Sequence, residues 1–261
     1  MNTGAFPKDI ARSDQPALRF DVFTLFPGMF DGPLSESILR RAQDQGIIDV
    51  RIHDIREWTP DRHRTADDTP YGGGAGMVLK APPIVEAVED VLGADHEQAW
   101  IVLLSASGRQ FTQSVARELS AASRIALICG RYEGVDARVP AILKAEELSV
   151  GDYVLTGGEL PAMIVVDAVA RLVPGVIEDA STADESFGDG LLEYPQYTRP
   201  VEFRGYRVPD VLLSGHHANV DIWRREQAIT RTKLLRPDLL QRRGNQTEGF
   251  QAPPGCGTNG E

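Results

Sequence analysis

Residues 125–134 have the sequence Ile125-Ala-Leu-Ile-Cys-Gly-Arg-Tyr-Glu-Gly134, an apolar run that ends in a glycine-bearing loop. A short apolar run rich in β-branched residues and closed by glycine predicts a strand buried on both faces of a sheet. Similar runs predict further strands at residues 20–26, 47–52 and 100–104. Apolar residues at helical spacing predict helices at residues 35–45, 81–92, 112–122 and 161–173. Strands that alternate with helices predict an α/β fold, a parallel sheet flanked by helices.

Glycines gather in three segments that each follow an expected strand: Tyr71–Met77, Cys129–Gly134 and Val150–Gly158. Glycine allows the backbone to approach a ligand closely, and open α/β sheets bind ligands at the carboxyl ends of their strands. Three such loops in one domain favour a small-molecule site over simple turns. The P-loop pattern and the Gly-x-Gly-x-x-Gly dinucleotide pattern are both absent from the sequence, which argues against an NTPase or an ordinary dinucleotide enzyme.

The composition is that of an ordinary globular protein, with 261 residues, 42% hydrophobic and 25% charged. No run approaches the roughly 18 apolar residues of a membrane helix, and residues 1–15 lack the pattern of a signal or transit peptide. The two cysteines, Cys129 and Cys256, form no disulfide framework, and the five histidines lack metal-ligand spacing. We therefore expect a cytoplasmic protein with no structural metal site and no membrane contact.

An acidic, glycine-containing stretch without apolar periodicity predicts an exposed linker between two domains. We expect a disordered extension at 1–17, a large domain at 18–177, the linker at 178–193, a mostly helical domain at 194–243 and a disordered tail at 244–261. The main helix of the small domain is expected from Asn219, a good N-cap, to Leu235, before Pro237. Between Arg199 and Arg243 lie ten basic and five acidic residues, although the chain carries a net charge of −11. This segment is compatible with nucleic-acid contact and also with a solvated surface.

Seven strings of the sequence resemble, in the same order, those of the bacterial tRNA (guanine-N1)-methyltransferases. They are Phe26-Pro27, Asp61-Arg-His-Arg-Thr-Ala-Asp-Asp68, Pro70-Tyr-Gly-Gly-Gly-Ala-Gly-Met77, Cys129-Gly-Arg-Tyr-Glu-Gly-Val-Asp136, Gly151-Asp-Tyr-Val-Leu-Thr-Gly-Gly-Glu-Leu-Pro-Ala-Met163, Tyr197-Thr-Arg-Pro200 and Leu213-Ser-Gly-His216. The resemblance extends over nearly the whole range from Leu18 to Leu240.

The resemblance implies a SPOUT-class fold with a trefoil knot that binds the methyl donor S-adenosylmethionine, and an obligate homodimer with active sites between the subunits. It implies transfer of a methyl group to N1 of the guanosine immediately 3′ of the anticodon, position 37 of tRNA, with Mg²⁺ as a possible assistant. Periodicity predicts no knot, because knots are rare exceptions to ordinary chain topology.

The reaction needs a base for the N1 proton and a cation or donor at O6, where negative charge develops. The resemblance assigns Arg171 as the cation and an aspartate at the end of the linker as the base. The linker is one residue shorter than the family pattern, so Glu185 stands where that aspartate is expected. Glu185 is the preferred base, and Asp184 is the alternative if the linker shifts by one residue.

The resemblance also assigns the residues of the donor pocket, and side chains that can contact tRNA phosphates or bases give candidate RNA-binding residues. The donor residues are Leu103, Leu104, Ser105, Gly108, Gly130, Tyr132, Glu133, Val150, Gly151, Asp152, Tyr153, Val154, Leu155, Gly157, Gly158 and Pro161. The RNA-binding residues are Arg62, His63, Arg64, Asp67, Arg199, Arg224, Arg225, Arg231 and Lys233. Ala106 stands where the family usually has proline, and Trp223 is better explained as a core residue of the small domain than as a base-stacking residue.

Two alternatives from other classes remain open. A catalytically impaired RNA-binding relative would keep the fold while Glu185 fails as a base, so it would bind the donor without transferring the methyl group. A nucleotide-dependent small-molecule enzyme would bind NAD or ATP instead of the methyl donor.

Overall fold

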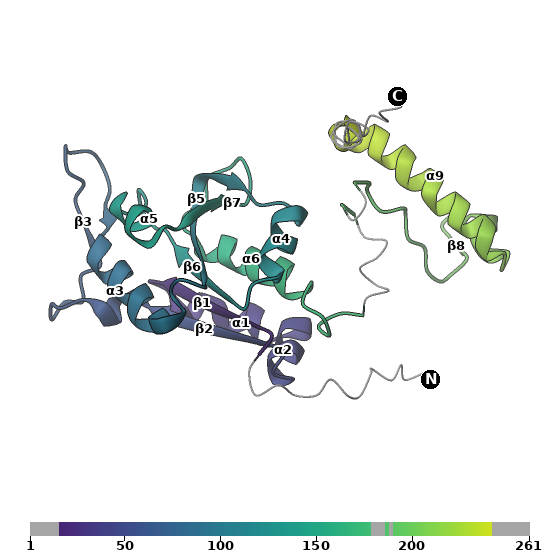
Figure 1. The fold of residues 1–261 in the computed structure, drawn as a ribbon. Coiled ribbons are helices and arrows are strands. Elements are labelled where there is room, and N and C mark those ends of the chain that lie inside the picture. The colour runs from purple at the N-terminus through teal and green to yellow at the C-terminus, as the bar shows by residue number, and fades with distance from the viewer. Residues whose placement is uncertain (1–15, 179–185, 188–189, 242–261) are drawn as a thin grey trace, which may run out of the picture. The chain divides into compact units, whose positions relative to one another are not determined.

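The computed structural model describes residues 16–178, 186–187 and 190–241. The chain divides into two compact units between Glu178 and Asp179. The first unit contains a five-stranded sheet in the order β2-β1-β6-β5-β7, in which every neighbouring pair is parallel. Its strands are β1 (Leu18–Thr24), β2 (Ile48–Asp54), β5 (Trp100–Gln110), β6 (Arg124–Cys129) and β7 (Glu146–Ser149). Figure 1 shows helices on both sides of this sheet, which confirms the expected α/β fold.

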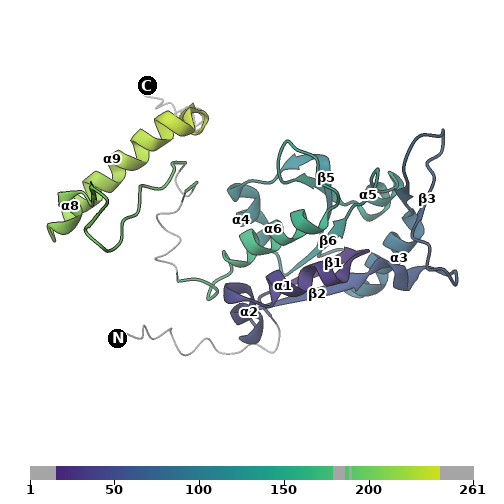
Figure 2. The same ribbon diagram turned by 180° about the vertical axis from the view of Figure 1, so that it is seen from behind.

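Helices pack on both faces of the sheet because alternate residues of each strand point to opposite sides. One core lies between the sheet and helices α2 (Ser37–Asp44), α4 (Gln113–Ser120) and α6 (Glu159–Ala170). The other lies between the sheet and helices α3 (Ala81–Leu92) and α5 (Arg138–Leu143). Figure 2 shows α6 running along the sheet on the first of these faces.

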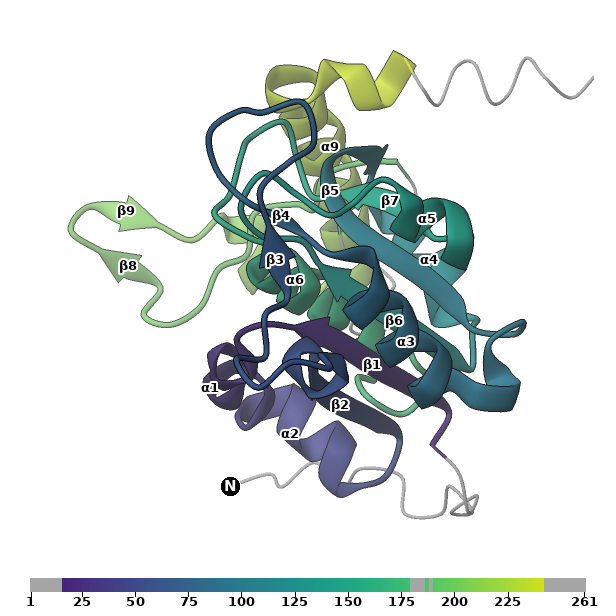
Figure 3. The same ribbon diagram turned by 90° about the vertical axis from the view of Figure 1, so that its left-hand side faces the viewer.

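Short elements connect the main ones. They are η1 (Pro27–Phe30), α1 (Asp31–Leu34), η2 (Ile55–Trp58), β3 (Asp67–Asp68), β4 (Val78–Leu79) and η3 (Gly93–Asp95). Strands β3 and β4 pair in antiparallel fashion at the base of a long loop, as Figure 3 shows. That loop carries the first glycine segment, so the glycines do not follow a strand of the main sheet as expected.

Most predicted elements are present with small shifts. Helix α3 has the predicted bounds, and the hydroxyl of Thr112 accepts a hydrogen bond from the Val115 N–H at the start of α4. Strand β7 was not among the predicted strands, because Glu146 and Glu147 make half of it charged. It is a strand nonetheless, since it pairs with β5 on both sides of a register shift between Leu104 and Arg109.

The second unit contains a hairpin and a long helix. Its elements are β8 (Glu202–Phe203), β9 (Tyr206–Arg207), α8 (Asp210–Leu213) and α9 (His217–Leu235). Helix α9 ends at Leu235 as predicted, but it begins at His217, so Asn219 lies inside the first turn and is not the N-cap. The buried hydroxyl of Thr232 donates to the Ala228 carbonyl and accepts from the Leu192 N–H at 2.9 Å, which ties α9 to the preceding segment.

A buried polar network joins strands β1, β2 and β6. Asp21 is fully buried and accepts hydrogen bonds at 2.8 Å from Arg124 Nε and from His53 Nε2. The Arg124 guanidinium also donates to Asp95 at 2.7 Å and to the carbonyl of Val91 at 2.8 Å. Burial acts to raise the pKa of the Asp21 carboxyl, but the hydrogen bonds from His53 and Arg124 outweigh it and hold that pKa below its usual value.

We expect the Arg124→Met substitution to lower the free energy of unfolding by about 3–5 kcal/mol, because it leaves the Asp21 carboxylate buried without its main counter-charge. Arg40→Met is the matched control, since Arg40 forms an ion pair with Asp44 at 3.5 Å on the exposed surface of α2. Its loss is expected to cost about 0.3–0.5 kcal/mol. Urea denaturation at neutral pH measures both, and equal losses for the two variants would contradict the role of Arg124.

Candidate functional site

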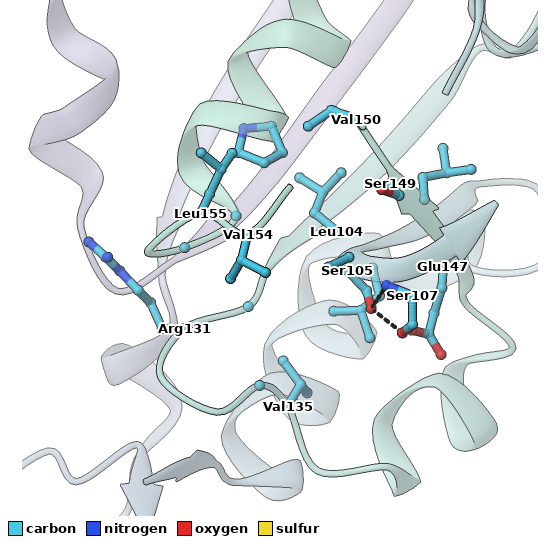
Figure 4. A pocket seen from close by; sticks show the side chains of 18 of the residues that line it. Leu104, Ser105, Ser107, Arg131, Val135, Glu147, Ser149, Val150, Val154 and Leu155 are labelled. Atoms are coloured by element: carbon cyan, nitrogen blue, oxygen red, sulfur yellow. Dashed lines mark hydrogen bonds between the residues drawn. The ribbon is translucent and has the colours of Figure 1, made fainter. Parts of the chain in front are cut away.

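A cavity of about 540 Å³ opens beside residues 103–107 of β5 and at the carboxyl ends of β6 and β7. Its volume is within the roughly 300–1,000 Å³ of small-molecule sites. Figure 4 shows it between β5, which carries Ser105 and Ser107, and the loops that follow β6 and β7. Its lining residues are Leu103, Leu104, Ser105, Ala106, Ser107, Gly130, Arg131, Tyr132, Glu133, Gly134, Val135, Ala137, Pro140, Glu147, Leu148, Ser149, Val150, Gly151, Tyr153, Val154, Leu155, Thr156, Gly157, Gly158 and Pro161. Because the three strands are parallel, their carboxyl ends meet at one edge of the sheet.

The cavity brings together the residues that the sequence assigned to a donor pocket, apart from Gly108 and Asp152. Gly108 has a different function in the structure. A Cβ atom there would lie 2.4 Å from the carbonyl carbon of Glu147, so glycine lets β5 approach β7 closely. Asp152 is exposed in the loop after β7 and is not among the lining residues.

Glycine allows the loops after β6 and β7 to lie against each other. The Gly158 N–H donates to the Gly130 carbonyl at 2.8 Å, and Arg131 forms a backbone bridge with Gly157. A Cβ atom at Gly158 would lie 2.7 Å from the Cα of Cys129, a distance that side-chain-bearing residues do not tolerate. The close contact therefore requires glycine at position 158 and places the start of α6 at the cavity.

The first glycine segment also reaches the cavity wall. The Glu133 N–H donates to the Met77 carbonyl, and the Leu79 N–H donates to the Gly134 carbonyl. A Cβ atom at Gly76 would lie 2.4 Å from a carboxylate oxygen of Glu133, so the glycine loop packs directly on this side chain. The three glycine segments, which are far apart in the sequence, thus meet at one site.

Polar groups lie on two sides of the cavity. The hydroxyls of Ser105 and Ser107 form a hydrogen bond at 2.8 Å, and the Ser107 hydroxyl donates to Glu147 at 3.4 Å. Burial, followed by a hydrogen bond to Asp67, raises the pKa of the Tyr132 phenol. This contact places Asp67, expected to bind RNA, beside the cavity wall.

The charges on the cavity wall favour a cation. The charged lining residues are Arg131, Glu133 and Glu147. The guanidinium of Arg131 lies 3.5 Å from the carboxylate of Glu159, which is 1% exposed, so this buried acid balances its charge. The carboxylates of Glu133 and Glu147 therefore give the wall a negative balance.

Of the three residues predicted to perform catalysis, the structure describes Arg171, and it is not among those that line the cavity. Arg171 is half-buried and is the C-cap residue of α6, directly after Ala170, and its N–H donates to the Asp167 carbonyl. Arg171 follows Pro161 at the cavity by ten positions, which is a rise of about 15 Å along a helix. Asp184 and Glu185 lie outside the described residues.

The predicted RNA-binding residues occupy two places. Arg62, His63 and Arg64 are exposed in the loop between η2 and β3 of the first unit. The carboxylate of Asp61 shapes this loop by accepting hydrogen bonds from the N–H groups of His63 and Thr65. These bonds lower the pKa of Asp61, the largest contribution coming from the Thr65 hydroxyl.

In the second unit, Arg199 and the basic residues of α9 carry the remaining predictions. Arg199, Arg225 and Lys233 are exposed, while Arg224 and Arg231 are half-buried. Arg224 forms an ion pair with Asp221 at 3.7 Å and lies over the Tyr194 ring at 4.9 Å. Trp223 is half-buried with its ring 6.2 Å from that of Tyr197, which fits the expected packing role.

Two features of the structure were not predicted from the sequence: two charged residues of the cavity wall and an exposed aromatic hairpin. Arg131 and Glu147 line the cavity, and the first belongs to the glycine segment quoted above. The β8–β9 hairpin exposes Phe203 and Tyr206, and the Arg204 guanidinium lies 5.1 Å from the centre of the Phe203 ring. The alternation of aromatic residues and arginines in this hairpin is the signal that could have identified it, because such side chains stack on unpaired bases.

Metal ligands and membrane helices were also sought in the parts of the chain that the structure describes. Within residues 16–178, 186–187 and 190–241, His, Cys, Asp and Glu side chains form no group of three that could hold a metal ion. Over the same ranges, the helices are too short or too polar to cross a bilayer.

Comparison with known proteins identifies a family and several similar relatives. The family model of tRNA (guanine-1)-methyltransferase TrmD matches residues 18–242. Three relatives named tRNA (guanine-N(1)-)-methyltransferase are similar to the chain over most of both sequences. The relative from Thermomicrobium roseum is 63% identical over 86% of this chain and 84% of its own length. Those from Chloroflexus aurantiacus and Citrifermentans bemidjiense are 59% and 56% identical over 86% and 85% of this chain, and over 89% and 90% of their own lengths.

Both the family match and these identities extend across the cavity and the second unit. They are far above the level at which only the fold is shared. The chain is therefore a methyltransferase and belongs to the tRNA (guanine-1)-methyltransferase family.

Proposed function

We propose that the chain transfers a methyl group from S-adenosylmethionine to N1 of the guanosine immediately 3′ of the anticodon, position 37 of tRNA. The observation that carries the proposal is the cavity lined by two glycine segments, with the third packed on the lining residue Glu133. Its residues coincide with those that the sequence resemblance assigned to the methyl donor, apart from Gly108 and Asp152. The relatives' names supply the class of RNA substrate and the atom modified.

The residues of the cavity fit S-adenosylmethionine in size and charge. The volume suits a ligand of this size, and the carboxylates of Glu133 and Glu147 suit a ligand with a positive sulfur and an ammonium group. Residues 103–107 of β5 and the loops after β6 and β7 would hold its adenosine through backbone groups. When bound, S-adenosylmethionine supplies a methyl group on a positively charged sulfur, which is already a good electrophile.

Two side chains of the protein then act on guanine, one on the N1 proton and one on the charge that develops at O6. A carboxylate of the linker, that of Glu185 or of Asp184, removes the proton from N1. Negative charge moves toward O6 as this proton leaves, and the Arg171 guanidinium stabilises it there. Holding N1 in line with the electrophilic carbon supplies a large part of the rate, because it removes the entropy cost of alignment.

The position of Arg171 supports a homodimer in which two subunits build each active site. Arg171 lies at the opposite end of α6 from the cavity, farther along the helix than an arginine side chain extends. A second subunit would supply Arg171 and the linker to the cavity of the first. Leu160 and Ile164 expose an apolar strip of α6, and Val154 beside the cavity is 88% exposed. These side chains form a surface suited to such a partner.

We also propose that the loops after β6 and β7 belong to the trefoil knot of the SPOUT fold. Their close contact at Gly158 and Cys129 supports this assignment. The predicted RNA residues of the Asp61–Asp67 loop and of α9 would contact the anticodon stem and its loop, with the second unit serving as the tRNA-binding domain. A tRNA substrate places the reaction in the cytoplasm.

Methyl transfer to tRNA transcripts tests the proposed function directly. We expect incorporation of labelled methyl groups into a transcript with guanosine at position 37 and background levels when adenosine replaces it. Runs with Mg²⁺ and with a chelator show whether the metal assists. Donor binding without methyl transfer would instead favour the catalytically impaired relative. This outcome is tested because Glu185 stands where the family pattern has aspartate.

Arg171→Ala is expected to reduce kcat by about 10²–10³-fold, because the negative charge at O6 loses its stabilising cation. Donor affinity is expected to stay near the wild-type value, since Arg171 is expected to act on O6 of guanine and not on the donor. Single-turnover kinetics measures the first quantity and isothermal titration calorimetry the second. Arg117→Ala, on the exposed surface of α4, is the matched control. A wild-type rate for Arg171→Ala would rule out the assigned role.

Glu185→Gln is expected to reduce methyl transfer to near background, whereas Asp184→Asn is expected to retain most of it. The amide cannot accept the N1 proton, although it keeps the shape of the side chain. Rates are measured from pH 6 to 9 with guanosine-37 transcript. The opposite pattern would identify Asp184 as the base. Full activity of both variants would show that neither linker carboxylate is the base.

A further inference from the structure

Arg131 contacts the loop of residues 150–158 from outside the cavity. Its side-chain stem is part of the wall, but Figure 4 shows the guanidinium pointing away from Val135 and Val154. The guanidinium donates through Nη1 to the Thr156 carbonyl at 2.7 Å. A Cβ atom at Gly157 would lie 2.6 Å from Arg131 Cδ, so the stem packs directly on the backbone of the loop.

The same guanidinium is held from the other side by a buried acid. The carboxylate of Glu159 lies 3.5 Å from Arg131 Nε and accepts a hydrogen bond from the Thr24 hydroxyl at 2.9 Å. The Thr24 hydroxyl in turn accepts the Phe26 N–H at 2.9 Å, and the Arg131 guanidinium lies 4.5 Å from the centre of the Phe26 ring. Arg131, Glu159, Thr24 and Phe26 therefore form one cluster, called here the Arg131 cluster.

The loop that Arg131 contacts has little packing of its own. Tyr153, Val154 and Leu155 are all exposed at its tip, although they also line the cavity. A segment with few buried side chains opens at low free-energy cost unless other contacts restrain it. Arg131 restrains this one, because it joins the Thr156 carbonyl to a buried carboxylate at the start of α6.

We propose that Arg131 is a positioning residue that holds loop 150–158 in the shape that binds the methyl donor. This inference rests on the proposed function, because it concerns the same cavity. Arg131 acts through the Thr156 carbonyl and not through contact with the reacting atoms. Its planar, permanently charged guanidinium can pair with Glu159 and donate to Thr156 at the same time, which suits it to this position better than lysine.

The test separates positioning from simple loss of stability. Arg131→Met removes both the counter-charge of Glu159 and the donor to Thr156, so both the melting temperature and the donor affinity are expected to fall. The double variant Arg131→Met/Glu159→Gln removes the unpaired buried charge, so its melting temperature is expected to recover toward the wild-type value. Its affinity is expected to remain at least tenfold below wild type, because the Thr156 carbonyl still lacks its donor.

Affinity is measured by calorimetric titration of the full-length protein with S-adenosylmethionine and, separately, with S-adenosylhomocysteine at 25 °C. Differential scanning calorimetry measures the melting temperature of the same samples. Arg131→Lys keeps the charge beside Glu159 and is expected to restore part of the affinity. Arg138→Met is the control, because Arg138 pairs with Asp136 at 2.6 Å on the surface and does not line the cavity.

The outcomes are distinguishable. Wild-type affinity in Arg131→Met, or full recovery of affinity in the double variant, would overturn the positioning role while leaving the proposed function intact. If wild-type protein binds neither compound, the proposed function fails and the role of Arg131 fails with it. Should Arg131→Met not fold, the double variant and Arg131→Lys decide the question on their own.

Discussion

The contact between Gly158 and the backbone of Cys129 is the constraint on which the rest of the site depends. The loop after β7 must cross the end of β6 with no side chain between them, and a Cβ atom at position 158 would lie 2.7 Å from the Cα of Cys129. This contact fixes where α6 begins and brings loop 150–158 beside loop 130–134. The cavity is the space that these loops enclose together with residues 103–107 of β5.

Two buried ion pairs lie at opposite ends of β6. Arg124 begins the strand and pairs with Asp21, deep in the sheet, where the contact serves stability. Arg131 follows the end of the strand and pairs with Glu159 at the cavity, where we assign it to loop positioning. The division agrees with the general arrangement of α/β proteins, in which one end of the sheet carries stability and the carboxyl end carries function.

Much of the fold was predictable because apolar periodicity is a local property of the chain. Four buried strands and helix α3 follow from runs of apolar residues, since every buried segment must present apolar side chains to its neighbours. Strand β7 was not predicted, because Glu146 and Glu147 interrupt the apolar pattern expected of a buried strand. It forms because it pairs with β5 on both sides of a register shift, and this pairing is not visible in the local sequence. The start of α9 at His217 was missed because the good capping residue Asn219 does not cap it.

The sequence by itself determined the glycine segments, the class of fold and the family strings, because these are patterns of neighbouring residues. Only the tertiary structure decided which of those residues share a cavity. It separated Gly108, needed where β5 meets β7, from the glycines of the wall, and it added Arg131 and Glu147. These results depend on distances between segments remote in the chain, which packing sets and no local pattern encodes.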